Sequence, residues 1–224
     1  MKRLVFFTSL FFICFLAAYF YNCFTTKTKV VLEVNRFEQE LFSINEDNIA
    51  AKTAGWQEVF GSFNEIFTTQ IIRISDQDTL GYYNALLAFV QDQDMREAYD
   101  STCMIFADFS DIHSDLELAF GRISNVFPDY PMPDITTFFG GFNFGVVTYD
   151  NNIGIGLENF LGQNSKYYRY LGNPKYLRFQ KQKKFISSNV IEVWFNEYFQ
   201  RYLGGRDLLS QMIYKGKMMY FLDK

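Results

Sequence analysis

Asp150 and Glu158 are the two acidic residues whose positions could support catalysis. They lie in a stretch, residues 138–162, that combines β-branched and aromatic residues with six glycines. Two carboxylates can act as acid and base when their surroundings shift their pKa values apart. Acidic residues at the ends of strands are more often simply solvated. A hydrolase that uses Asp150 and Glu158 is therefore an alternative hypothesis for the function.

A calcium loop is a second kind of chemistry that this region could suggest. Asp150, Asn152 and Gly154, followed by Glu158, have part of the spacing of such a loop. The glutamate that an EF-hand places at position twelve is absent. Asx side chains hydrogen-bond their own backbone and tolerate left-handed φ values, so residues 150–152 are predicted to form a turn. We therefore predict no metal site here.

Histidine and cysteine chemistry has little support in the sequence. His113 is the single histidine, whereas a zinc peptidase needs two histidines one helical turn apart. A nucleophilic pair of Cys103 and His113 would need an orienting third group, and nothing near either residue suggests one. Cys103 is expected to be a buried free thiol. Because no nucleophile elbow, P-loop or dinucleotide fingerprint is present either, we predict no catalytic residue and no cofactor.

The N-terminus contains the most specific local signal in the sequence. Lys2 and Arg3 precede an apolar run, Leu4 to Phe20, which is typical of an export signal. Cys23 follows directly and begins a polar tether, which favours a lipoprotein whose acylated cysteine is the first mature residue. A non-acylated signal and an uncleaved membrane anchor remain the alternatives. The predicted organisation is a signal (residues 1–22), a tether (23–29) and one domain (30–224).

Composition limits the class of protein. The chain has 224 residues, of which 49% are hydrophobic and 20% aromatic, so it can build one sizeable core. A formal charge of −4 argues against binding to the backbone of a nucleic acid. Residues 175–184 form a basic amphipathic stretch whose lysines could meet lipid headgroups, although cationic residues on a surface helix are usually just solvated.

The periodicity of apolar residues predicts a mainly helical α+β domain. Strands are expected at Ile135–Phe139, Phe142–Tyr149 and Ile153–Leu157, and together they would form a small antiparallel sheet. Gly154 and Gly156 share one face of the last strand, which allows an element, expected to be a helix, to pack closely there. Helical spacing covers residues 45–74, 80–90, 95–109, 114–127, 189–202 and a segment from 207 onwards.

Three segments, together with the N-terminal cysteine, resemble the gliding-motility lipoprotein B family (GldB). They are VNRFEQELF at 34–42, NIGIGLENFLG at 152–162 and MIYKGKMMY at 212–220. The resemblance spans residues 30–224 and implies a membrane-anchored lipoprotein of the cell envelope that faces the periplasm. It also implies a role in gliding or the associated secretion through contacts with other envelope proteins, without enzymatic activity. Family members continue past the last segment, so the sequence is expected to be incomplete at its C-terminus.

The order of the elements also resembles a zincin-type peptidase that has lost its metal motif. In that analogy the helix after the sheet would hold the motif, and residues 191–195 (IEVWF) would occupy the H-E-x-x-H positions. Both histidines are replaced by apolar residues. Glu192 alone cannot hold zinc, so the analogy predicts a scaffold without the chemistry.

Overall fold

The computed structural model describes residues 30–74, 78–200 and 207–222. The predicted export segment and Cys23 lie outside these ranges. Within them, no helix combines the length and the apolar character that crossing a bilayer would require.

The first half of the domain is mainly helical. Its elements are β1 (Val34–Arg36), α2 (Phe37–Phe42), α3 (Ile49–Phe60), α4 (Phe63–Ile66), the π-helix η1 (Phe67–Ile71), α5 (Thr79–Gln91), α6 (Gln93–Ile105) and α7 (Ser110–Val126). The helix predicted over 45–74 is thus divided, and the break falls at Gly61, which has a φ of 54°. Gly55, the other glycine in this segment, lies inside α3 without interrupting it.

The second half contains the hairpin and the C-terminal helices. Its elements are β2 (Ile135–Phe138), β3 (Val146–Tyr149), β4 (Asn152–Gly156), the 3-10 helix η2 (Leu157–Phe160), α8 (Lys166–Tyr170), α9 (Lys175–Arg178), the 3-10 helix η3 (Lys183–Phe185), α10 (Ile186–Phe199) and α11 (Leu208–Leu222). The α+β prediction is confirmed. The predicted start of α10 at Asn189 was wrong. The helix begins at Ile186, and Asn189 lies inside it and donates its side-chain N–H to the carbonyl of Phe185.

The sheet is mixed, which corrects the prediction of an antiparallel one. Its strand order is β1-β2-β4-β3, and only the β3–β4 pair is antiparallel. After β2 the chain crosses to the far edge of the sheet, runs back along β3 and returns through the hairpin as β4, parallel to β2. The loop after β2 and the C-terminal end of β4 therefore lie at the same end of the strands, whereas the hairpin turn lies at the opposite end.

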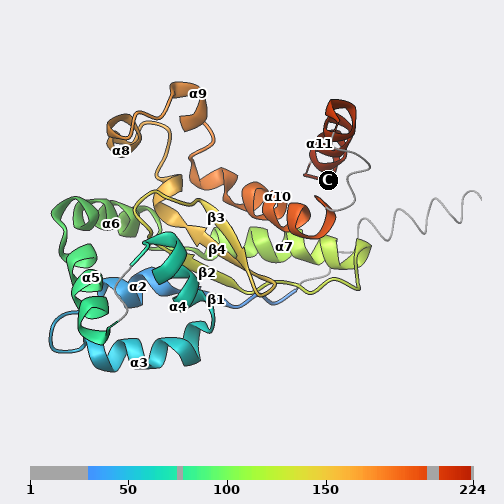
Figure 1. Ribbon diagram of the computed structural model, residues 1–224. Helices are drawn as coiled ribbons and strands as arrows, with labels where there is room; N and C mark the ends of the chain where they lie inside the picture. The colour runs from blue at the N-terminus through green and yellow to red at the C-terminus, as the bar shows by residue number, and fades with distance from the viewer. Residues whose placement is uncertain (1–29, 75–77, 201–206, 223–224) are drawn as a thin grey trace, which may run out of the picture.

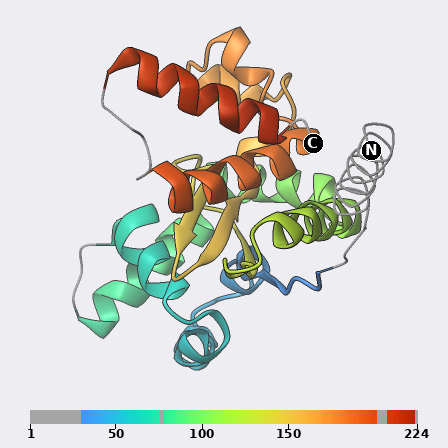
Figure 2. The ribbon, with the colours of Figure 1, turned by 90° about the vertical axis from the view of Figure 1, so that its right-hand side faces the viewer.

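Two hydrophobic clusters cover the two faces of the sheet. The core between the sheet and helices α7 and α10 takes Ile135, Ile153 and Ile155 from the strands. The aromatic core on the other face takes Phe138 and Tyr149 and packs them against residues from α2 to α6. Figure 1 shows this arrangement, with α7 and α10 on one side of the strands and α2 and α4 on the other. Figure 2 shows that α8, α9 and α11 lie at the end of the molecule opposite α3.

The glycine face of β4 is in contact with the aromatic core, as the sequence predicted. A Cβ atom on Gly154 would lie 2.7 Å from Val147 and 3.0 Å from the ring of Phe63 in α4. A Cβ atom on Gly156 would overlap with the carbonyl oxygen of Phe144 and approach the ring of Phe138. The helix expected over this face is α4, which contributes Phe63. The other side-chain contacts come from strand residues of the same sheet, Val147 and Phe138.

Replacing Gly156 by Ala should lower the free energy of unfolding by about 2 to 4 kcal/mol, because the new methyl group meets backbone that cannot rotate away. Gly55→Ala is the matched control, since nothing lies within 4 Å of its Cβ position in a helix. It should leave stability unchanged or raise it by up to about 1 kcal/mol. Urea unfolding measures both values, and equal losses in the two variants would contradict the close packing of β4.

Candidate functional site

Asp150 lies in the turn of the β3–β4 hairpin and is exposed to solvent. Asp150 and Asn151 have φ values of 43° and 67°, the left-handed pair that a two-residue hairpin turn requires. Five residues of β4 separate this turn from η2, so Asp150 and Glu158 are roughly 15 Å apart along the strand. The structure does not bring the two carboxylates together, and it provides no geometry for acid–base catalysis by this pair.

Glu158 is completely buried beneath the loop that follows β2. Its Oε1 atom accepts hydrogen bonds from the backbone N–H of Gly140, at 2.8 Å, and of Phe142, at 3.1 Å. Gly141 and Phe142 both have positive φ, which turns these N–H groups towards one point. The carboxylate thus fills an anion-binding concavity of the protein's own backbone. Because Glu158 has no exposed surface, a substrate cannot reach it in this conformation.

Burial controls the protonation of Glu158. Loss of solvent raises the pKa of its carboxyl group to about 7, although the backbone N–H groups and Lys181 act in the opposite direction. The Oε2 atom is buried and has no hydrogen-bond partner among the described residues. Protonation of the carboxyl removes the cost of a buried charge, which is why burial favours the neutral form.

Residues next to Glu158 fasten the following segment to the sheet. The hydroxyl of buried Tyr168 donates to the carbonyl of Glu158 at 2.9 Å and accepts from the N–H of Leu161 at 2.8 Å. Lys181 donates to the Asn159 side chain at 2.7 Å and lies 5.0 Å from the centre of the Tyr168 ring. Burial lowers the pKa of Lys181, and the charge of Glu158 partly opposes that change. These contacts make the neighbourhood of Glu158 a structural junction.

The other residues considered from the sequence have ordinary structural surroundings. His113 lies in α7, where its Nε2 atom is 3.0 Å from the Leu32 carbonyl and 3.5 Å from the Glu117 carboxylate. Cys103 is a free thiol, half-buried in α6 and not fully buried as predicted. Glu192 accepts a hydrogen bond from Lys215 of α11 at 3.0 Å. Among the described residues, no group of three or more His, Cys, Asp and Glu side chains could hold a metal ion.

A partly buried ion pair between β1 and α2 was not predicted from the sequence. The Nε atom of Arg36 is 2.6 Å from Oε1 of Glu38, and the hydroxyl of Thr137 donates to Oε2 at 2.6 Å. A second guanidinium nitrogen of Arg36 donates to the carbonyl of Phe106 at 3.1 Å. Both charges are therefore paired and hydrogen-bonded, as buried charges must be. The signal available in the sequence was an Arg-x-Glu spacing inside an apolar segment.

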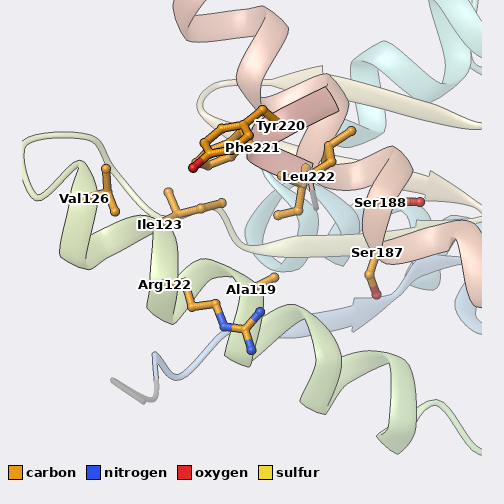
Figure 3. Close-up of a pocket in the computed structure, with 10 residues that line it drawn as sticks. Ala119, Arg122, Ile123, Val126, Ser187, Ser188, Tyr220, Phe221 and Leu222 are labelled. Carbon is orange, nitrogen blue, oxygen red and sulfur yellow. The ribbon is translucent and has the colours of Figure 1, made fainter. Parts of the chain in front are cut away.

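A concave apolar surface lies between α7, α10 and α11, and we call it the groove. Its volume is about 360 Å³. Figure 3 shows that side chains of all three helices surround one space, among them Ile123 and Val126 of α7 and Phe221 and Leu222 of α11. Ile191 of α10 adds to the apolar lining. The groove contains no arrangement of groups for catalysis, but it is large enough to accept apolar side chains of a ligand.

The buried carboxyl of Glu158 should make stability depend on pH. Its folded-state pKa of about 7 is above the ordinary value of 4.5, so the folded protein binds more protons than the unfolded one between these pH values. Stability should fall as pH rises from about 4.5 to about 7, by up to roughly 3 kcal/mol. Glu158→Gln removes this titration but keeps the acceptor for Gly140 and Phe142. Urea unfolding at pH 5 and pH 8 should show a smaller loss in the variant, and parallel pH profiles would contradict the assignment.

Comparison with known proteins identifies the family. The profile of a family described as gliding motility protein GldB matches residues 24–224, which include every described helix and strand. No curated protein and no solved structure matches the chain. The match agrees with the resemblance of the three sequence segments, and all three form observed structure. VNRFEQELF makes β1 and α2, NIGIGLENFLG makes β4 and η2, and MIYKGKMMY lies within α11. The chain belongs to the GldB family of gliding motility proteins.

Proposed function

We propose that this protein is a non-enzymatic lipoprotein of the cell envelope, facing the periplasm, that supports gliding motility or the associated secretion by binding other envelope proteins. Membership of the GldB family supports the assignment to motility. The observation that carries the binding mechanism is the groove and the adjoining exposed face of α11. The carboxylate hydrolase is less well supported, because Asp150 and Glu158 lie at opposite ends of β4 and Glu158 is inaccessible.

Helix α11 is apolar on the face that packs against the domain and also on the face that it exposes. Tyr214, Met218 and Phe221 contact the core between the sheet and α7 and α10. The outward face carries these exposed apolar side chains: Leu208, Leu209, Met212, Ile213, Met219 and Tyr220. Contiguous apolar surface that a domain leaves exposed marks an interaction site. We infer that a partner covers α11.

The occupant that fits this surface best is an amphipathic helix of another protein. The groove is concave and apolar, which suits the anchoring side chains of a helix. The charged side chains of α11 are Lys215, which pairs with Glu192 of α10, and Lys217, and the helix contains no acidic residue between Leu208 and Leu222. Charge complementarity therefore favours a partner helix whose apolar stripe is bordered by Asp and Glu. It disfavours a second copy of α11, which would place lysines against lysines.

Membrane attachment would come from Cys23. A thioether-linked, N-acylated cysteine carries several fatty chains, which hold a protein far more firmly than one chain does. The polar residues 24–29 would then connect the lipid to β1, which begins four residues after Val30. This arrangement leaves the groove available to proteins in the periplasm.

Placing a carboxylate in the groove should abolish motility. Val126→Glu and Met219→Glu add a charge to the groove and to the outward face of α11, where the native side chains are 44% and 69% exposed. Burying that charge against an apolar partner should weaken binding roughly 100-fold. Val59→Glu in α3 is the matched control, since Val59 is 59% exposed at the other end of the molecule.

Each variant is introduced into a gliding host that lacks its own gene, and colony spreading is measured together with protein level by immunoblot. Spreading should be lost for Val126→Glu and Met219→Glu at normal protein level and kept for Val59→Glu. Normal spreading with both Val126→Glu and Met219→Glu would refute the proposed site. Sedimentation of the wild type as a dimer that Met219→Glu dissociates would instead assign the surface to self-association.

Replacing Cys23 by Ala tests the lipid attachment. The variant should lose labelling by radioactive or alkyne-tagged fatty acid, and its mature size should change because the lipoprotein peptidase no longer recognises the site. Unchanged labelling and mobility would exclude Cys23 as the acylated residue. A variant that stays in the membrane fraction without label would favour the uncleaved anchor at Leu4 to Phe20.

A further inference from the structure

Residues 162–184 leave the body of the domain and return to it at one place, and we call this excursion the basic arm. Its neck is closed by the backbone bond from the N–H of Gly162 to the carbonyl of Lys181, at 2.8 Å, and by the antiparallel bridge between Leu161 and Gln182. Tyr168 anchors the arm from inside, as described above. The two short helices α8 and α9 therefore project from the domain (Figure 1) while their base is fixed.

The charge of the arm differs sharply from that of the whole protein. Residues 166–184 contain seven of the 21 lysines and arginines, and no acidic residue occurs between Glu158 and Glu192. The complete chain has a formal charge of −4. Lys166 and Lys183 pair with Glu97 and Asp111 of the body. Arg169, Lys175 and Lys184 have no carboxylate partner within the described part of the chain, so they are available to an external anion.

Exposed aromatic and aliphatic side chains lie among these cations. Tyr170 and Tyr176 are 80% and 74% exposed, and Phe179, Leu171 and Leu177 are also exposed. Side chains with an apolar body next to cationic side chains are typical of the interface between water and lipid. Rings place their apolar part at the level of the headgroups, while lysine and arginine bind phosphate oxygens.

We propose that the basic arm is a peripheral membrane contact that binds the anionic headgroups of a phospholipid surface. The contact is independent of the groove and of acylation at Cys23. Both views place the arm at the same end of the molecule as α11, away from α3 (Figures 1 and 2). Binding through the arm would therefore hold the domain in one orientation on the membrane and keep the α11 surface close to the bilayer.

Vesicle binding by the chain from residue 24 to residue 224 tests the proposal without the lipid. This chain keeps both hydrophobic clusters, whose residues all lie between Val30 and Leu222. Vesicles of phosphatidylcholine alone are compared with vesicles that contain 30% phosphatidylglycerol as a probe composition of about physiological surface charge. Binding should be at least about tenfold tighter to the anionic vesicles and should weaken with added salt.

Three pairs of substitutions locate the contact. Arg169→Gln with Lys175→Gln should reduce partitioning to anionic vesicles roughly 30-fold, since each cation near the surface contributes about a fivefold factor. Lys52→Gln with Arg73→Gln removes the same charge from the region of α3 and η1 and should change partitioning by less than about threefold. Tyr170→Ser with Tyr176→Ser keeps the charge and should also weaken binding, because two interfacial rings are lost.

Three results would overturn the proposal. One is equal partitioning to the two kinds of vesicle. Another is an equal loss in the arm and control pairs, which would mean that net charge alone is responsible. The third is binding to dextran sulfate or polyglutamate, lost in the Arg169 and Lys175 variant, without binding to vesicles, which would assign the arm to an acidic polymer. Circular dichroism confirms that each variant is folded.

Discussion

The close approach of β4 to the aromatic core is the constraint on which the rest of the structure depends. β4 lies between β2 and β3, and hydrophobic clusters cover both faces of the sheet at this strand. Ile153 and Ile155 fill one face, whereas Gly154 and Gly156 leave the other face without side chains. Phe63 and Phe138 occupy the space that the glycines leave. A larger residue at either glycine would push the aromatic core away from the sheet and disturb the packing on both sides.

The direction of β4 also determines which segments meet at the C-terminal end of the strands. Since β2 and β4 are parallel, the loop after β2 and the helix η2 after β4 lie next to each other there. Glu158 can therefore bind the N–H groups of that loop, and Asn159 can bind the carbonyl of Phe144 at 2.9 Å. Tyr168 and Lys181 then attach the basic arm to the same point. The buried acid Glu158 thus links the core to the projecting basic arm.

Much of this architecture could be predicted from local sequence, and the failures have a common cause. The hairpin, its Asp150 turn and the helix positions follow from residue type and periodicity within short windows. β1 could not be recognised as a strand of this sheet, because three residues pair with β2 about a hundred positions later. Parallel pairing leaves no local signature. The burial of Glu158 had a weak signal, since Leu157 and Phe160 flank it in an apolar segment. Its hydrogen bonds depend on the loop conformation, which the sequence pattern does not reveal.

The two surfaces proposed for binding differ in shape and charge, and this difference separates their ligands. The groove is concave and apolar, so it gains affinity from side chains that fill it and exclude water. The arm is convex and cationic, so its affinity comes from many weak contacts with a surface of fixed negative charge. The side chains of a protein helix can fill the groove, and a layer of lipid headgroups provides the negatively charged surface for the arm. Because both surfaces lie at the end of the molecule opposite α3, one orientation of the domain can use both at once. Under the two proposals, this member of the GldB family would contribute to a motility assembly by holding a partner at a defined place on the membrane.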